Sequence, residues 1–360
     1  MGEPSIREIR ARLLVWYEEH RRDLPWRRTQ DPYRILVAEY LLQRTRIASG
    51  TPYYERFLAR FPTIRDLAAA PLDDVLAVWE GLGFYGRARN LHAAAKAVVE
   101  RFGGAIPRSY NALSSLPGMG PYTAGAVSSI AFGVPVPAVD GNVTRVIARL
   151  YRIHEDVGKG VTSRRIREIA GRLVSPENPG AFNQAMMELG ATVCAPSSPA
   201  CGHCPLERLC LARGAGEERE LPWAPKRPSV RVVPVVFALV EADGHILLVR
   251  RPPGTLLGGL WSLPGGETTR SADRRHATAA MVRDQADVEV AVLNRLRRVD
   301  RRFSHRKWSG SIYRCAPIVI PEESPTVRWV RFEEALRLPL VPFHREAIEA
   351  FAGGRPFSDR

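Results

Sequence analysis

Apolar positions in the first 212 residues recur at the spacing of a helical face. In the stretch IREIRARLLVWYEEH, Ile9, Leu13 and Tyr17 fall on one side of a helix. The same period continues through RILVAEYLLQRTRIASG, LDDVLAVWEGLGF, RARNLHAAAKAVVERFGG, GPYTAGAVSSIAFG, GNVTRVIARLYRI, SRRIREIAGRLV and GAFNQAMMELGATVC. The first of these seven follows Pro32 and closes on Gly50, which predicts one helix between them. No strand-like alternation competes, so residues 1–212 are predicted to be all-α.

The pattern changes after residue 212. Residues 213–230 are rich in Gly, Pro and mixed charge without a period, which indicates a linker. Apolar runs typical of strands begin at 231, and Asp243 and Gly244 between two of them predict a β-hairpin. One helical stretch (ADRRHATAAMVRDQA) and further strands (VEVAVLNRLRRV, GSIYRCAPIVI and VRWVRF) complete an α+β domain over 231–352, which a tail follows at 353–360. The chain is therefore predicted to be multidomain.

Composition and charge narrow the class of protein. A length of 360 residues allows two or three domains. The net charge of +14 favours a polyanionic partner, most simply nucleic acid, although a solubilising surface is the alternative. The sequence has no apolar run long enough to span a membrane, and the N-terminus lacks the apolar centre of a signal peptide. We therefore expect a cytoplasmic protein with no membrane partner, associated with the nucleoid if its source is bacterial.

Four of the five cysteines lie close together, in the pattern Cys194-x6-Cys201-x2-Cys204-x5-Cys210. A reducing compartment disfavours disulfides, and four thiolates at this spacing can enclose one metal centre. The spacing alone leaves tetrahedral zinc and an iron–sulfur cluster open. His203 lies inside the loop and is interpreted as a solvated residue, because four thiolates suffice. The fifth, Cys315, is predicted to be a buried strand residue.

Two further motifs carry candidate chemistry. The segment LPGMGPYTAGAV, residues 116–127, predicts two helices joined by a tight turn that Gly118 and Gly120 permit. Backbone amides at the start of the second helix can bind a phosphate. Asp140 precedes a helix, where an aspartate commonly serves as a cap. Glu39 lies on an otherwise apolar helix, where exposure to solvent is the alternative to a role in a site.

The helical chain, the hairpin and the cysteine spacing together resemble the endonuclease III, or helix-hairpin-helix, superfamily of DNA glycosylases. The resemblance implies a catalytic Asp140, with Asn142 beside it, and DNA binding by the hairpin around Gly118 and Gly120. It implies a six-helix barrel module at about 25–130, with the N-terminal helix and residues 131–212 forming an iron–sulfur module. It also implies a [4Fe–4S] cluster on Cys194, Cys201, Cys204 and Cys210.

Within this superfamily the chain resembles the MutY-type adenine glycosylases, in which the residue at Glu39 is the general acid. Breaking an N-glycosidic bond needs a proton on the leaving base and negative charge near the sugar cation, and two carboxylates with separated pKa values supply both. The resemblance implies that Glu39 protonates a flipped adenine at N7 and that Asp140 stabilises the oxocarbenium ion. Tyr122 stands where strand-cutting members carry lysine, and residues 97–158 hold no lysine. We therefore predict a monofunctional glycosylase.

Other positions match the same branch. The resemblance assigns Trp26, Arg27, Gln184 and Glu188 to the base pocket, and it assigns Gln43, Arg44, Thr45, Leu82, Phe84 and Tyr85 to DNA contacts. Leu82 and Phe84 are the candidate wedge into the duplex, and core packing is the alternative for Leu82 and Trp26. Arg44 departs from the branch, which commonly carries glutamine there. Certain thymine mismatch glycosylases carry arginine at this position, so a thymine or uracil mismatch glycosylase is the alternative function.

The C-terminal domain resembles the Nudix fold, but its metal-binding tract is degenerate. Asp284 and Gln285 occupy metal-binding positions and Ala280 replaces an arginine, so nucleotide hydrolysis is not expected. Phe303, Ser304 and His305 match the loop with which the MutY-type enzymes probe 8-oxoguanine, where hydroxyl and imidazole groups hydrogen-bond the base and an aromatic ring stacks on it.

The whole sequence thus predicts a monomeric adenine DNA glycosylase acting on A:8-oxoG or A:G pairs in double-stranded DNA. A non-catalytic iron–sulfur DNA-binding protein is the alternative from another class, and the presence of both Glu39 and Asp140 argues against it.

Overall fold

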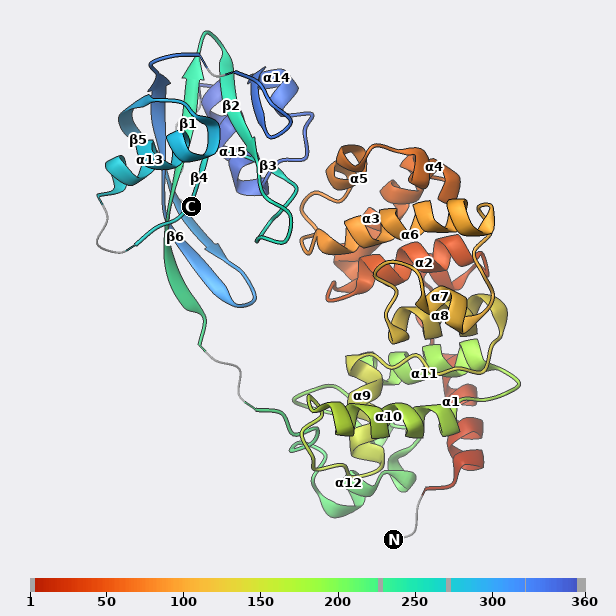
Figure 1. Ribbon diagram of the computed structural model, residues 1–360. Helices are drawn as coiled ribbons and strands as arrows, with labels where there is room; N and C mark the ends of the chain where they lie inside the picture. Colours follow the sequence, from red (N-terminus) through yellow and green to blue (C-terminus); the bar gives the residue numbers. More distant parts are fainter. Residues whose placement is uncertain (1–3, 226–228, 270–272, 321, 355–360) are drawn as a thin grey trace. The chain divides into compact units, whose positions relative to one another are not determined.

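The computed structural model describes the chain except residues 1–3, 226–228, 270–272, 321 and 355–360. It divides into two compact units, residues 1–70 with 86–226, and residues 71–85 with 227–360 (Figure 1). In the part of the chain that is described, no helix is long and apolar enough to cross a membrane. The domain boundaries predicted from composition stay a prediction.

The first unit is built of helices, as the apolar period predicts. They are α1 (Ile6–His20), α2 (Pro32–Leu42), α3 (Ile47–Arg60), α4 (Ile64–Ala69), α6 (Gly86–Phe102), α7 (Tyr110–Ser114), α8 (Pro121–Phe132), α9 (Gly141–Leu150), α10 (Gly160–Leu173), α11 (Pro179–Thr192) and α12 (Leu211–Ala215), with 3-10 turns η1 (Pro25–Arg27), η2 (Cys201–His203) and η3 (Glu207–Leu209).

The single helix predicted between Pro32 and Gly50 is wrong, because the chain turns after Leu42. Gln43 leaves helical dihedrals with ψ at 113°, and Arg44 adopts a left-handed φ of 60°. The next helix, α3, begins at Ile47 and runs through Gly50. A residue at positive φ interrupts a right-handed helix, so the apolar period continues across a break that it does not reveal.

One core cluster of this unit lies where α1, α9, α10 and α11 pack together. Ile9, Leu13, Ile147, Phe182 and Leu189 are each at most 1% exposed and belong to one cluster. Burial of each such side chain contributes about 1.5–3 kcal/mol. Three of the clustered cysteines, Cys194, Cys204 and Cys210, pack against the edge of this core. The cysteine loop is therefore anchored on the helices that also carry Asp140.

The second unit contains one mixed sheet and its covering helices. The strands are β1 (Arg231–Ala242), β2 (His245–Arg250), β3 (Trp261–Ser262), β4 (Gly265–Glu267), β5 (Val290–Arg302), β6 (Arg306–Pro317) and β7 (Val327–Arg331), and the helices are α5 (Leu72–Val78), α13 (Arg274–Ala286), α14 (Phe332–Ala335) and α15 (Pro342–Ala352). The main path of the sheet is β3-β2-β1-β6-β5, in which β1 and β6 are parallel. The α+β prediction is confirmed.

Alternation along β1 decides which helix covers each face of the sheet. Val236 and Val240 pack with Val282 of α13, whereas the ring of Phe237 contacts Phe343 and His344 of α15. Successive side chains of a strand point to opposite faces, so the sheet is sandwiched between the two helices. Residues 71–85 join this unit, in which Arg345 of α15 donates to both carboxylate oxygens of Glu80 at 2.5 and 2.7 Å.

Candidate active site

Glu39 is a buried carboxyl on a helix whose other side chains are mostly apolar. The helix α2 starts with Pro32 at its first position and with Asp31 as its cap, whose carboxylate accepts from the Tyr33 amide at 2.8 Å. Glu39 lies near its C-terminal end and is 8% exposed. Its Oε2 accepts a hydrogen bond from the Tyr122 hydroxyl of α8 at 2.6 Å. The predicted solvent-facing alternative is therefore wrong for Glu39.

The pKa of Glu39 is raised from 4.5 to about 7. Burial is the largest cause, since it disfavours the charged form. The hydrogen bond from Tyr122 opposes the shift, the charge of Asp140 adds to it, and the charge of Arg27 opposes it. A carboxyl with a pKa near neutrality can both give and take a proton at physiological pH. Glu39 therefore has the property that a general acid requires.

Asp140 caps the helix α9, and its carboxylate is held by the start of that helix. Oδ1 accepts from the Val143 amide at 2.8 Å, and Oδ2 accepts from Nδ2 of Asn142 at 2.8 Å. The pKa of Asp140 is raised, because the effect of burial exceeds the lowering by these hydrogen bonds and by the charge of Arg145. The capping role predicted as an alternative is present, and the side chain also lines the pocket described next.

A pocket of about 380 Å³ brings both carboxyl groups to one space. Its walls come from η1, α2, α3, α8, α9 and α11, and include Trp26, Arg27, Glu39, Thr45, Tyr122, Asp140, Asn142, Gln184 and Glu188. The structure thus assembles all four predicted base-pocket residues with the predicted catalytic ones. The volume is in the range of small-ligand sites, about 300–1,000 Å³. Sequence reasoning missed Arg22, Arg46 and Met187, which line it too.

Glu188 joins two arginines into one wall of this pocket. Its fully buried carboxylate accepts from Nε and Nη2 of Arg22 at 2.7 and 2.6 Å and from Nη2 of Arg27 at 2.8 Å. Although burial acts in the opposite direction, the hydrogen bonds from both arginines lower the pKa of Glu188 to about 2. Glu188 therefore stays ionised and engages the cation of Arg27 a short distance from Glu39.

The remaining pocket residues form its aromatic and polar lining. Trp26 packs edge-on against Tyr54 with ring centroids 5.3 Å apart. The Oε1 atom of Gln184 accepts from the Tyr17 hydroxyl at 3.2 Å. The Tyr122 hydroxyl lies 3.4 Å from the sulfur of Met187. Burial raises the pKa of Tyr122 well above 10, so its hydroxyl remains a donor.

The predicted DNA-contacting residues lie in both units. In the first unit, Gln43 donates to the Thr123 hydroxyl at 3.1 Å, and Gly118, with φ at +68°, lies so close to Asn90 that a Cβ would fall 2.3 Å from its side chain. Gly120 caps α8. In the second unit, Leu82 is half-buried, Phe84 is 47% exposed, and the buried Tyr85 accepts from the Gly81 amide at 3.3 Å.

The four clustered cysteines are neighbours in the fold. Burial raises the pKa of Cys201 and Cys210 and that of Cys204 to about 12, and the nearby Cys194 raises each further. Arg149, which is 2% exposed, donates to the Cys194 sulfur at 3.2 Å. Its other acceptors are the carbonyls of Ala195, Pro196 and Leu221, each at 2.8 Å.

A buried guanidinium needs negative charge or strong acceptors nearby, and Arg149 finds three carbonyl oxygens and the Cys194 sulfur. Among the described residues, no group of three or more His, Cys, Asp or Glu is assembled as a site for a metal ion. The cysteine loop is also linked to Asp140. Arg145 donates to the carbonyl of Cys194 at 2.7 Å and to Oδ1 of Asn142 at 2.9 Å, and Asn142 donates to Asp140.

The segment from Phe303 to His305 forms the turn between β5 and β6. Ser304 and His305 are exposed, and the Phe303 ring packs edge-on against Trp308 at 5.0 Å. On α13, Gln285 does not stand free as a metal ligand. Its side chain accepts from the Gly265 amide at 2.9 Å and donates to the Gly265 carbonyl at 3.2 Å. This agrees with the expectation that the tract is degenerate.

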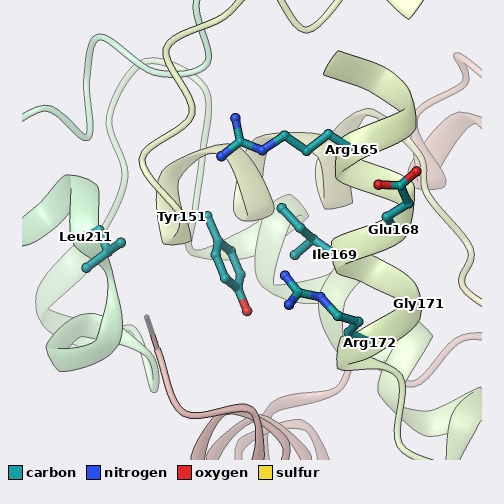
Figure 2. A pocket seen from close by; sticks show the side chains of 7 residues that line it. All are labelled: Tyr151, Arg165, Glu168, Ile169, Gly171, Arg172 and Leu211. Atoms are coloured by element: carbon teal, nitrogen blue, oxygen red, sulfur yellow. The ribbon is translucent and has the colours of Figure 1, made fainter. Parts of the chain in front are cut away.

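A second hollow of about 730 Å³ lies in the first unit, at α10 and α12. Figure 2 shows Arg172 of α10 extending toward the ring of Tyr151, with Arg165 of the same helix on the same side of the hollow. The hollow shares no lining residue with the pocket of Glu39, and the one carboxyl among its lining residues belongs to Glu168. It lacks the pair of acids, so the candidate catalytic chemistry lies in the smaller pocket.

Comparison with known proteins agrees with this geometry. Residues 37–172 match the HhH-GPD superfamily of base excision DNA repair proteins, and residues 235–350 match the NUDIX domain. The chain is 34% identical to a human protein named adenine DNA glycosylase, over 98% of the chain and 75% of that protein. It is 36% identical to the rat protein of the same name, over 92% and 75%.

Solved structures resemble the helical unit. A thermostable thymine-DNA glycosylase superposes with a TM-score of 0.53 at 32% identity, covering 58% of this chain and 97% of that one. Endonuclease III in a non-covalent DNA complex superposes with a TM-score of 0.50 at 27% identity, covering 60% and 99%. The predicted helix-hairpin-helix glycosylase fold is thereby confirmed.

The raised pKa of Glu39 predicts that the free energy of unfolding falls as pH rises. In the unfolded chain this carboxyl ionises near pH 4.5, and in the folded chain near pH 7. The folded state therefore loses stability relative to the unfolded state as pH rises from about 4.5 to 7. We expect Glu39→Gln to gain stability over the wild type across this window, reaching on the order of 3 kcal/mol. Denaturant unfolding at pH 4.5 and 8 measures the difference.

The control is Glu55→Gln, since Glu55 is exposed on α3. Its stability should run parallel to that of the wild type. Parallel curves for Glu39→Gln as well would show that Glu39 ionises normally in the folded protein.

Proposed function

The chain belongs to the adenine DNA glycosylase family of the HhH-GPD base excision repair superfamily, and from this premise we propose that it removes adenine paired with 8-oxoguanine or guanine in double-stranded DNA. The observation that carries the proposal is the pocket in which Glu39, held by Tyr122, shares one space with Asp140. Chemistry of this kind needs an acid and an anion at opposite sides of the bond that breaks.

The two carboxyl groups have different roles in the reaction because their surroundings differ. Glu39, whose pKa is about 7, gives its proton to N7 of the flipped adenine, and the electrons of the glycosidic bond leave with the base. Asp140, whose carboxylate accepts from the Val143 amide and from Asn142, acts as the anion that stabilises the oxocarbenium ion that remains. Glu39 then accepts a proton from the water that attacks the sugar. Tyr122 and Asn142 keep the two carboxylates in place.

The reaction ends at the abasic site. Strand cutting by a Schiff base needs an amine in the pocket. Tyr122 occupies the position at which strand-cutting members carry lysine, and the residues that line the pocket include no lysine. We therefore infer a monofunctional enzyme.

The cysteine loop is proposed to hold a [4Fe–4S] cluster through Cys194, Cys201, Cys204 and Cys210. The buried Arg149 beside Cys194 supports a negatively charged group there. A bound cluster supplies a rigid cross-link and an electron-transfer centre. A chain of hydrogen bonds through Arg145 and Asn142 connects the cysteine loop with Asp140.

Recognition of the opposite base is proposed to come from Phe303, Ser304 and His305. The Ser304 hydroxyl and the His305 imidazole are exposed to solvent and can hydrogen-bond the edge of an oxidised purine. Neighbouring basic side chains already pair with carboxylates, Arg301 with Glu346 and Lys307 with Asp300. One of these ion pairs, Lys307 with Asp300, joins β6 to β5 beside the loop.

A second candidate function is thymine or uracil mismatch excision. It is favoured by Arg44 and by the 32% identity to a thymine-DNA glycosylase. The NUDIX match and the similarity to adenine glycosylases over more than 90% of the chain favour adenine.

Single-turnover base release from A:8-oxoG, A:G, T:G and U:G duplexes tests the function. We expect release from the two adenine pairs, and we expect Glu39→Gln and Asp140→Asn to slow it by at least about 100-fold, in line with loss of an acid or of electrostatic stabilisation. Glu55→Gln is the matched control and should act as the wild type does. Strands should break only after heat or alkali. Release of thymine with adenine untouched would establish the second candidate instead.

The recognition loop is tested by changing Ser304 and His305 together to alanine. We expect the preference for A:8-oxoG over A:G to fall by about tenfold or more, because two hydrogen bonds of about 1 kcal/mol each are lost. The rate on A:G should stay near that of the wild type. Ser324→Ala, in another exposed turn of the same unit, serves as control. An unchanged preference would remove the loop from recognition.

The cluster is tested by metal analysis of protein purified without oxygen. We expect iron and acid-labile sulfide in equal amounts in the wild type and in Cys315→Ala, because Cys315 is buried in the other unit. Cys204→Ala should lose both and unfold at a lower temperature, since Cys204 packs on the helical core. One zinc per chain with no sulfide would identify the zinc alternative.

A further inference from the structure

Arg87, at the start of α6, is a buried arginine beneath the end of the helix that carries Glu39. It is 7% exposed. Its Nη1 atom lies 3.1, 2.7 and 2.6 Å from the carbonyl oxygens of Tyr40, Leu41 and Gln43, and 3.1 Å from the Thr45 hydroxyl. These acceptors belong to the last turn of α2 and to the chain that follows it.

In this position Arg87 can satisfy the unpaired carbonyls at the C-terminal end of α2 and interact with the partial negative charge there. The last carbonyls of an α-helix have no partner within the helix, and its C-terminal end carries partial negative charge that favours a cation. Burial lowers the pKa of Arg87 to about 10, which still leaves it protonated at neutral pH. All four acceptors converge on Nη1 of Arg87. A lysine ammonium is a point charge whose nitrogen lies one bond nearer to the backbone, so it does not reproduce this contact set.

The chain that Arg87 holds has an unusual conformation. Gln43 leaves the helix and Arg44 takes a positive φ of 60°, which side chains other than glycine seldom adopt. Such a turn persists only where its surroundings hold it. Besides the bond from the Thr45 amide to Leu42 at 3.1 Å, Arg87 supplies contacts on both sides of Arg44.

The turn connects with the pocket at three points. Glu39 immediately precedes Tyr40, whose carbonyl Arg87 contacts. Gln43 donates to Thr123 of α8, next to Tyr122. Thr45 itself lines the pocket. Arg44 is exposed on the outside of the same turn.

We propose that Arg87 is a positioning residue that fixes the Gln43–Thr45 turn in the shape that receives the mispair. It acts on recognition of the extruded base and its surroundings, and it leaves the proton transfer of Glu39 intact. The identity of the base that the turn receives rests on the proposed function, whereas the role of Arg87 in holding the turn does not.

The matched control is Arg10, which clamps the end of a different helix. Arg10 of α1 donates to the carbonyls of Leu173 and Arg172 at 2.9 Å and of Val174 at 2.7 Å, at the C-terminal end of α10. Arg10 does not line the pocket of Glu39. Arg10→Met therefore removes a similar helix-end clamp without touching the site.

The experiment compares Arg87→Lys, Arg87→Met and Arg10→Met in single-turnover release of adenine at increasing enzyme concentration. We expect the half-saturating concentration to rise about tenfold or more for Arg87→Lys and further for Arg87→Met, with the rate at saturation within about twofold of the wild type. Arg10→Met should match the wild type in both. An Arg87→Lys enzyme with normal half-saturation, or one whose whole loss lies in the saturated rate, would overturn the proposal.

Hydrogen exchange keeps the proposal testable apart from activity. Amides of residues 42–46 should exchange faster in Arg87→Lys than in the wild type or Arg10→Met, while those of residues 33–38 stay protected. Equal exchange at 42–46 in all three would overturn the positioning role. A wild type that releases no adenine from any duplex would overturn the proposed function, and the exchange result would still decide the role of Arg87. If Arg87→Met fails to fold, Arg87→Lys, which keeps the cation, decides.

Discussion

The site depends on keeping the Glu39 carboxyl out of water without giving it a direct cationic partner. A buried carboxyl retains its proton because the charged form loses hydration. A guanidinium in hydrogen-bond contact would reverse this by favouring the anion. Arg27 lines the same pocket, but its guanidinium donates to Glu188 and to the Arg22 carbonyl. The direct hydrogen-bond donor to Glu39 is the neutral Tyr122 hydroxyl. The pocket thus holds the Arg27 cation together with a carboxyl whose pKa is near neutrality, because the carboxylate of Glu188 engages the cation.

Asp140 carries the same functional group in different surroundings. Burial raises its pKa too, but the hydrogen bonds from a helix-start amide and from Asn142 favour the anion and oppose that rise. Arg145 extends this arrangement to the cysteine loop through the carbonyl of Cys194. Two chemically similar residues therefore differ in what opposes the effect of burial: one tyrosine hydroxyl beside Glu39 on an apolar helix, and the amide and side-chain donors of a helix cap at Asp140. That difference is what acid-catalysed cleavage of a glycosidic bond requires.

Much of this arrangement was predictable from the sequence, for physical reasons that vary by residue. Helical periods predicted the all-α region. Resemblance to a superfamily predicted Glu39, Asp140 and the four other residues that the structure brings into the same pocket. The break after Leu42 was missed because apolar spacing continues across a positive φ at Arg44, and no glycine marks it. Arg22 and Arg87 were missed because a charged residue in an arginine-rich chain gives no local sign of burial. Their roles arise from partners more than 40 residues away, such as Glu188 and Gln43. A sequence pattern reports local geometry, whereas the pairing of buried charges is set by the tertiary fold.

The division into two units constrains how discrimination between mispairs can arise. Glu39 and Asp140 belong to the first unit, and the exposed turn at 303–305 belongs to the second. The described contacts of the carboxyl groups all come from the first unit, so the proton affinity of Glu39 is set there. We propose that the turn at 303–305 contacts the opposite base, and such contacts reach the reaction through the duplex. These contacts contribute binding free energy that positions the adenine nucleotide. They speed the chemical step only if they are stronger in the transition state than in the bound ground state. Selectivity for the opposite base should accordingly be separable from the acidity of Glu39, because different units of the chain supply them.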